Sequence, residues 1–188
     1  MDIAPTPAPM TREAFLDWAE RQELPYEFDG VEPVPMNGGS FWHFKITSNI
    51  MRELFTRLDE RTYQVLPPGA GISTVGDKVR FPDVLVIPAG TSSPVRLMPN
   101  PIVVFEVKSP SSDRLDRFTK AREYAAVPSI LRYVLLEQDS MHGSVMSRRA
   151  GGQSWTLDPL TQGETLRLPE IGAEVPLDAF YAGVEFPA

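Results

Sequence analysis

Two segments that are apolar along their whole length, residues 84–87 (VLVI) and 102–105 (IVVF), constrain the fold of this chain more than any other feature. The side chains of a β-strand alternate between the two faces of its sheet, so a run without polar residues predicts a strand whose sheet is covered on both faces. The sequence therefore favours a central sheet buried between helices over a sheet with one face in water.

Two amphipathic helices are available to cover this sheet. One is predicted over residues 42–60, and the other follows the Ser/Pro-rich segment 109–112, because apolar residues recur in both at the spacing of one helix face. We expect the following residues to face the sheet: Ile46, Ile50, Leu54 and Leu58 in the first helix, and Leu115, Phe118, Ala121 and Ala125 in the second.

The remaining elements are shorter. Thr11 is an N-cap residue that opens a first helix, and the dipeptide Asp29-Gly30 favours a tight hairpin turn between two short strands. Together these elements predict an α/β (α+β) fold with a central mixed β-sheet flanked by helices. The other predicted strands cover residues 63–66, 79–87, 102–108 and 130–136, with short strands toward the C-terminus.

Length and composition indicate one folded domain. At 188 residues the chain is long enough to bury a core without disulfides or a structural metal. Residues 1–10 are rich in Pro and Ala and are expected to form a disordered tail, which leaves residues 11–188 as a single domain. The absence of cysteine excludes disulfides, a thiolate zinc site and a cysteine nucleophile. Because no stretch resembles a signal peptide or a spanning helix, we expect a cytoplasmic protein without a membrane partner.

The strand over residues 102–108 ends in two charged residues. Glu106 and Lys108 are two positions apart and share one face of the strand with Val104. Burying both charged groups at the end of an apolar strand is unfavourable unless they pair, reach solvent or bind a metal. An ion pair that merely closes the sheet is the simpler interpretation of an isolated Glu-x-Lys pattern, whereas a cleft at the strand end would give the pair a catalytic role.

Asp83 supports the catalytic interpretation. It follows Pro82 and begins the apolar segment FPDVLVI, so its carboxylate meets that of Glu106 if the two strands pair. Two carboxylates, a backbone carbonyl and water form an oxygen site suited to Mg²⁺ or Mn²⁺, which can activate water for attack on a phosphodiester. We predict Asp83 and Glu106 as catalytic metal ligands and Lys108 as a catalytic cation that orients the water or stabilises the phosphate.

The pattern of Pro82-Asp83 followed by Glu106-x-Lys108 resembles the signature of the PD-(D/E)XK nuclease superfamily. More narrowly, the chain resembles the Uma-two family of restriction endonucleases from TREAFLDWAE through YEFDGVEPVPM, FPDVLVI and VVFEVKSPSS to DRFTKAREYA and LRYVLLE. The resemblance implies a restriction endonuclease-like fold and a metal-dependent endonuclease that hydrolyses phosphodiester bonds in nucleic acid, with DNA as the expected substrate.

The resemblance also implies residues outside the two central strands. Glu27 would supply a further catalytic carboxylate to the metal cleft, with an exposed strand residue as the alternative interpretation. His43, at the start of the long helix, would touch a phosphate or a metal-bound water, with a structural hydrogen bond as the alternative.

The second long helix carries the family's Asp, Lys and Tyr at Asp116, Lys120 and Tyr124, whose spacing of four places them on one stripe. Asp116 and Tyr124 are predicted to bind substrate, and Lys120 to be catalytic. Many family members have an apolar residue at the position of Lys108, so the sequence leaves open which of the two lysines acts.

The acidic balance of the chain leaves a second function open. A formal net charge of −7 gives no overall attraction to nucleic acid, although a local basic patch could provide it. The alternative is a non-cleaving module that binds nucleic acid or protein. Because restriction-type nucleases often cut two strands as dimers, we also expect a homodimer, formed through the C-terminal strands.

Overall fold

The computed structural model describes residues 10–36, 38–91, 95–108, 114–149 and 154–186. The predicted tail over residues 1–10 therefore lies, apart from Met10, outside the described residues. The helices are α1 (Arg12–Ala19), α2 (Phe41–Phe55), α3 (Arg114–Ala126) and α4 (Leu177–Phe180), with a 3₁₀ turn, η1 (Val75–Asp77). The strands are β1 (Tyr26–Phe28), β2 (Pro33–Pro35), β3 (Tyr63–Leu66), β4 (Ile72–Ser73), β5 (Val79–Arg80), β6 (Val84–Pro88), β7 (Val103–Lys108), β8 (Arg132–Glu137), β9 (His142–Arg148), β10 (Trp155–Thr161), β11 (Thr165–Leu168) and β12 (Ala173–Pro176).

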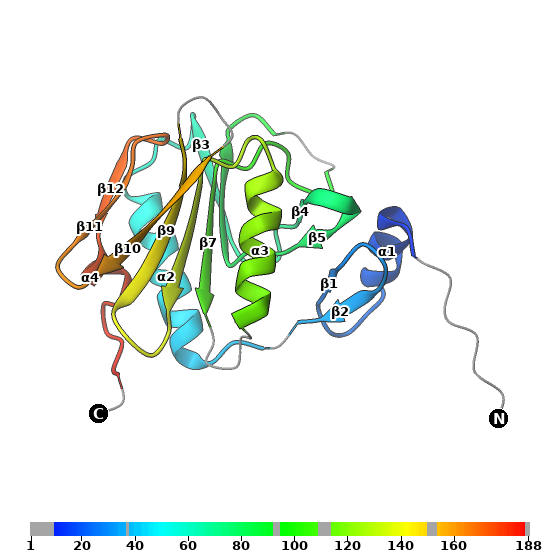
Figure 1. Cartoon of the computed structure of the whole chain (residues 1–188), viewed down its shortest axis with the longest axis horizontal. Coiled ribbons are helices and arrows are strands. Elements are labelled where there is room, and N and C mark those ends of the chain that lie inside the picture. The colour runs from blue at the N-terminus through cyan, green and yellow to red at the C-terminus, as the bar shows by residue number, and fades with distance from the viewer. Residues whose placement is uncertain (1–9, 37, 92–94, 109–113, 150–153, 187–188) are drawn as a thin grey trace.

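The central sheet has six strands among the described residues, in the order β10-β9-β8-β7-β6-β3. β7 and β8 are parallel, whereas the other neighbouring pairs are antiparallel. Helix α2 covers one face of this sheet and α3 the other (Figure 1). The expected mixed sheet between helices is therefore what the structure has.

Alternation along β7 divides the core into two layers. Val103, Phe105 and Val107 pack toward α2, while Val104 packs on the α3 side against Tyr124. Each large side chain buried in these layers stabilises the fold by about 1.5–3 kcal/mol. The layers fix β6 and β7 rigidly, and β6 begins and β7 ends beside the start of α2.

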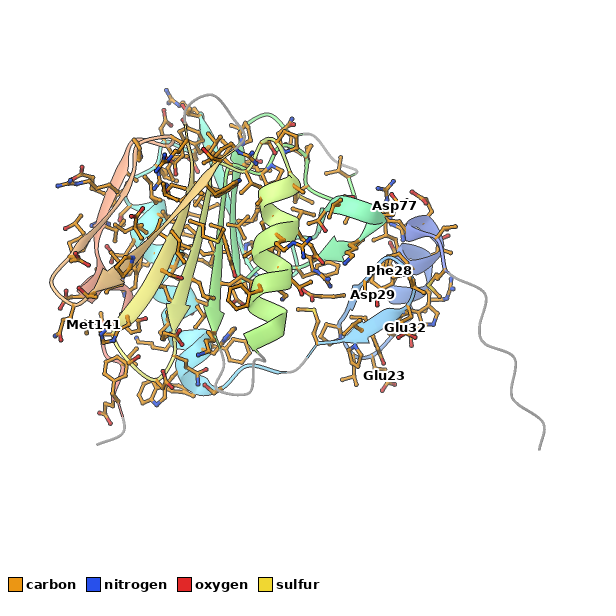
Figure 2. The ribbon with its side chains drawn as sticks, viewed as in Figure 1. Glu23, Phe28, Asp29, Glu32, Asp77 and Met141 are labelled. Atoms are coloured by element: carbon orange, nitrogen blue, oxygen red, sulfur yellow. The ribbon has the colours of Figure 1, made fainter. Side chains whose placement is uncertain are left out.

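A smaller sheet, in the order β2-β1-β5-β4, lies beside α3 and carries α1 on its outside (Figure 1). Its core is aromatic, because the ring of Phe15 in α1 stacks on Phe28 in β1 with the centroids 4.9 Å apart. Asp29 shapes the β1–β2 turn by accepting hydrogen bonds from the backbone N–H groups of Val31 and Glu32. Phe28 at the end of β1 and Asp29 and Glu32 in the β1–β2 turn lie together, across the molecule from Met141 (Figure 2).

Three details differ from the sequence expectations. The segment 79–87 is two strands in different sheets, because Pro82 lacks a backbone N–H and interrupts the ladder. The helix predicted over residues 42–60 ends at Phe55. Phe118 is 62% exposed and does not face the sheet, since the inward face of α3 carries Glu123 and Tyr124 instead. No helix in the described ranges has the length and apolar character needed to span a bilayer.

Candidate active site

Asp83 and Glu106 lie opposite each other where β6 and β7 meet the start of α2. The antiparallel register pairs Val84 with Phe105, so the next pair outward is Asp83 and Glu106. Directly opposed residues have their Cβ atoms about 4.5–5.5 Å apart. Asp83 is anchored across the sheet, because its Oδ2 accepts a 2.7 Å hydrogen bond from the backbone N–H of Val107. The two carboxylates selected from the sequence therefore share one strand end.

Glu106 is an electrostatically strained carboxylate. Its side chain is only 13% exposed, and its Oε1 accepts a 2.7 Å hydrogen bond from the Tyr124 hydroxyl. Burial raises the pKa of Glu106 to about 7; the Lys120 ammonium opposes this rise, while the charges of Asp83 and Glu27 add to it. Glu106 is therefore a carboxylate that the protein keeps out of water, beside one cation and two further carboxylates.

This strain predicts a pH-dependent stability in metal-free buffer. The folded protein binds the Glu106 proton more tightly than the unfolded chain does. The contribution of Glu106 to the free energy of unfolding is therefore fully present below pH 4.5 and is lost as the pH rises toward 7. The expected loss is up to about 3 kcal/mol, and Glu106→Gln should abolish it. Urea denaturation from pH 5 to 7 in EDTA measures the difference. Equal pH slopes for the two proteins would show that Glu106 is not strained.

Other titrating groups do not obscure this window. Burial alone would raise the pKa of Glu123, but Arg80 and Lys78 lower it, so its stabilisation is lost only at more acidic pH. Burial alone would lower the pKa of His43, but Asp83 raises it, so its stabilisation is lost above about pH 6.5. Comparison with Glu106→Gln subtracts the Glu123 contribution, whereas the charge of Glu106 also raises the pKa of His43, so the two proteins are best compared below pH 6.5.

The structure distinguishes the two candidate lysines by their partners. The Lys120 ammonium, on the inward face of α3, lies 3.1 Å from Oε1 of Glu27 and 3.6 Å from Oε1 of Glu106. The Lys108 ammonium lies 2.9 Å from Oε2 of Glu137, its neighbour on β8. Lys120 is thus the lysine that bridges the predicted acidic residues, whereas Lys108 pairs with Glu137 on the neighbouring strand and not with Glu106, the partner that the simpler interpretation of Glu-x-Lys gave it.

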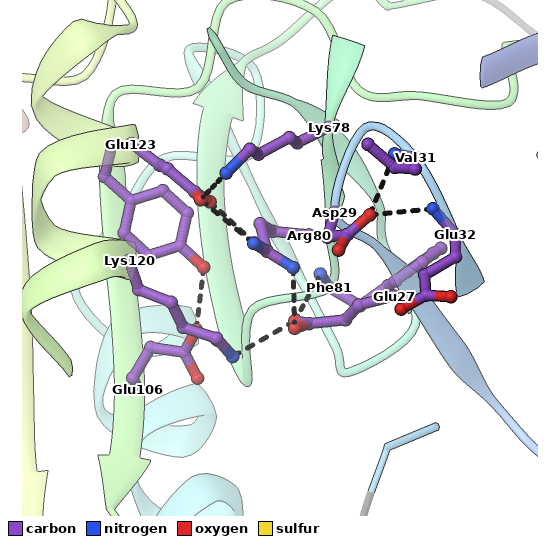
Figure 3. Close-up of polar contacts among 11 residues, drawn as sticks. Glu27, Asp29, Val31, Glu32, Lys78, Arg80, Phe81, Glu106, Lys120 and Glu123 are labelled. Atoms are coloured by element: carbon purple, nitrogen blue, oxygen red, sulfur yellow. Dashed lines mark hydrogen bonds and ion pairs between the residues drawn. The ribbon is translucent and has the colours of Figure 1, made fainter. Parts of the chain in front are cut away.

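Behind Lys120 lies a buried chain of alternating charges that the sequence did not indicate. Arg80 donates to both carboxylate oxygens of Glu123, at 2.6 and 3.0 Å, and to Glu27 at 3.2 Å (Figure 3). Lys78 donates to Glu123 at 2.8 Å. The chain of ion pairs therefore runs from the small sheet through α3 to Glu106, and it holds Glu27 where it can position Lys120.

His43 faces Asp83 from the first turn of α2. Ser40 caps this helix by accepting the His43 backbone N–H, which fixes the helix start. The ring Nε2 lies 3.0 Å from Oδ1 of Asp83, and burial, which lowers the pKa of His43, is outweighed by that carboxylate. Gly39 lies so close that a Cβ there would be 2.5 Å from Cδ2 of His43, so a side chain at position 39 would displace the ring.

The remaining two predicted residues have different outcomes. Tyr124, predicted to bind substrate, has a fully buried side chain, and its hydroxyl donates a hydrogen bond to Glu106 from the interior. Asp116 belongs to α3, but its side chain lies outside the described residues. Glu123, which sequence reasoning missed, lies three residues after Lys120 and could have been found from the same helical stripe.

The donor set fits a hard divalent cation bound together with substrate. No group of three or more His, Cys, Asp or Glu side chains in the described ranges forms a ready cage for a metal. Mg²⁺ rarely uses such a cage: it takes one or two carboxylates and completes its shell with water and substrate phosphates. Asp83 and Glu106, opposed at one end of the sheet, are the two carboxylates that could take this role.

Comparisons with known proteins agree with this fold. The Uma2 family model, described as "Putative restriction endonuclease", matches residues 12–179. Two proteins of Synechocystis sp. (strain ATCC 27184 / PCC 6803 / Kazusa) are similar over most of their length: slr1290 is 28% identical over 97% of this chain and 96% of its own, and sll1609 is 26% identical over 85% and 92%. A crystal structure from Anabaena variabilis ATCC 29413, described as "a putative nuclease belonging to DUF820", superposes with a TM-score of 0.75 at 12% identity over 93% of this chain and 98% of that one.

Proposed function

Because the chain belongs to the Uma2 family, described as "Putative restriction endonuclease", we propose that it is a metal-dependent endonuclease that hydrolyses phosphodiester bonds in nucleic acid, with DNA as the expected substrate. The observation that carries this proposal is the pair of opposed carboxylates, Asp83 and Glu106, with Lys120 beside Glu106. Glu27 completes the polar wall of the site through its contact with Lys120.

Asp83 and Glu106 are the proposed ligands for Mg²⁺ or Mn²⁺. A metal held there would supply Lewis acidity toward a phosphate oxygen and lower the pKa of a bound water. The hydrogen bond from the Val107 N–H leaves Asp83 in a fixed orientation, and the Tyr124 hydroxyl does the same for Glu106. Because ligands of this kind are already arranged before substrate binds, no free energy is spent on rearranging them during the reaction, and the reaction barrier is lower.

Lys120 and His43 are the proposed cationic groups. Lys120 places an ammonium beside Glu106, where it can orient the attacking water or neutralise charge that develops on the phosphate. His43 contacts the opposite carboxylate, Asp83, and restrains it from the α2 side. The two groups therefore flank the carboxylate pair from the two helices that cover the sheet.

The contrast between the lysines gives a direct prediction. Lys120→Met should lower kcat by about 10²–10³-fold, because it removes the ammonium beside Glu106. Lys108→Met should leave kcat within a few-fold, because its partner is Glu137. Single-turnover cleavage of a labelled oligonucleotide measures both. A larger loss in Lys108→Met than in Lys120→Met would reverse the assignment.

The proposed function itself is tested by metal-dependent cleavage. Plasmid DNA, single-stranded DNA and RNA are incubated with the protein in Mg²⁺, in Mn²⁺ and in EDTA, alongside Asp83→Asn purified in the same way. We expect internal cleavage that needs the metal and is lost in the variant. Cleavage that survives in Asp83→Asn would place the activity elsewhere, and no cleavage of any substrate would favour the non-cleaving binding module that the acidic net charge suggests.

A further inference from the structure

Four aromatic residues follow one another at the start of α2: Phe41, Trp42, His43 and Phe44. The His43 ring contacts Asp83, but the Phe41 and Phe44 side chains are 71% and 53% exposed. Keeping two phenylalanine rings in water within one helical turn of the candidate active site is unfavourable, and an exposed apolar group of this kind marks a binding surface.

The exposed rings are held in place by their neighbours. The Phe44 ring lies edge-on to the His43 ring, with the centroids 5.4 Å apart, and a Cβ on Gly39 would lie only 3.2 Å from its tip. The Phe41 ring lies edge-on to Trp42, with the centroids 4.9 Å apart. Each ring is therefore held by one aromatic neighbour, while more than half of its side chain stays exposed to a partner.

The charge of the chain limits what that partner can be. Recognition of duplex nucleic acid relies mainly on cations that neutralise phosphates, and a net charge of −7 does not favour it. A single strand carries phosphates too, but its charge density is lower, and stacking of its bases on aromatic rings adds about 1–3 kcal/mol per base, which a base enclosed in a double helix does not provide. An acidic protein with free aromatic rings beside its site is thus better suited to unpaired bases.

We propose that the substrate is single-stranded nucleic acid, whose bases stack on Phe44 and Phe41 while the adjoining phosphate reaches Asp83 and Glu106. This inference rests on the proposed nuclease function and specifies its substrate class. The continuity of contacts supports it: Phe44 touches the His43 ring, and His43 in turn lies 3.0 Å from Asp83. A base on Phe44 therefore belongs to a nucleotide close to the carboxylates.

Helix α2 offers a matched control. Phe55, at the other end of the helix, is 58% exposed but lies eleven residues from Phe44, which is about 16 Å along the axis. Binding is measured by fluorescence anisotropy in EDTA, with a labelled single strand and the corresponding blunt duplex, on the Glu106→Gln background so that nothing is cleaved. The measurement reports binding alone and does not depend on whether the protein is an active nuclease.

The single strand is expected to bind at least about tenfold more tightly than the duplex. Phe44→Ala and Phe41→Ala should each weaken single-strand binding by about tenfold, Phe44→Trp should preserve it, and Phe55→Ala should change it less than twofold. Equal affinity for duplex, or equal loss in Phe44→Ala and Phe55→Ala, would overturn the proposal. So would a Phe44→Ala variant that halves the mass measured by light scattering, because the rings would then join two copies of the chain.

Absence of cleavage together with tight, Phe44-dependent binding of single strands would reject the nuclease function and keep this surface. If the wild-type protein cleaved duplex as fast as single strands, the nuclease function would stand and the preference for single strands would be rejected. The two proposals therefore fail separately.

Discussion

Replacement of Glu106 by glutamine is expected to lower kcat by at least about 10²–10³-fold and, at the same time, to stabilise the metal-free protein at pH 7. The activity falls because Glu106, one of the two proposed anionic ligands, is lost and only Asp83 remains. The stability rises because a carboxylate whose pKa burial raises to about 7 is replaced by a neutral group of the same shape. A substitution that lowers activity but raises stability identifies a residue that serves the reaction and not the fold.

This first prediction is checked by single-turnover kinetics and urea denaturation on the same preparation. Glu170→Gln is a suitable control, because Glu170 is a partly buried carboxylate outside the candidate site. Its two oxygens accept hydrogen bonds from Arg132 at 2.7 and 2.9 Å. It should lose stability and keep its rate per folded molecule. A Glu106→Gln protein that loses stability as well as activity would identify Glu106 as a structural residue.

Removal of the Arg80 guanidinium has the largest expected effect on folding. Arg80 is almost fully buried, and its two partners, Glu27 and Glu123, are buried with it. Removing one member of a buried ion network leaves uncompensated charge and typically destabilises by 3–5 kcal/mol. Because each carboxylate keeps one lysine, we expect Arg80→Met to lose about 3 kcal/mol, a large share of the stability of an ordinary domain.

The control for this second prediction lies on the surface. Arg96 also pairs with two carboxylates, those of Asp17 and Glu20, but all three side chains are exposed, so Arg96→Met should cause a much smaller loss. Combining Arg80→Met with Glu123→Gln should recover part of the stability, since one unpaired carboxylate is then removed. Equal losses for the two arginine variants in urea denaturation would contradict the buried network.

The central strands and the acidic pair could be predicted from the sequence for a local reason. VLVI and IVVF are apolar in every position, which only a sheet covered on both faces explains, and Asp83 and Glu106 each mark the place where such a run meets polar residues. Strand pairing then brings the two together, since β6 and β7 are consecutive in the chain and antiparallel.

The buried charge network could not be predicted in the same way. Arg80 is the second residue of the two-residue strand β5 and lies between the apolar residues Val79 and Phe81. Its partners are 53 and 43 positions away in the sequence. No periodic pattern connects residues at such distances. Phe118 was predicted to face the sheet from its helical spacing, and this was wrong. The inward face of α3 carries Glu123 and Tyr124 instead, whose side-chain oxygens form hydrogen bonds with Arg80 and Glu106.

Manganese bound to a crystal of the protein tests the central claim most directly, because Mn²⁺ substitutes for Mg²⁺ and scatters anomalously. We expect one anomalous peak where β6 begins and β7 ends, within about 2.0–2.3 Å of a carboxylate oxygen from each of Asp83 and Glu106. The absence of a peak there at millimolar Mn²⁺, or a peak bound by only one of the two carboxylates with the other turned away, would contradict it.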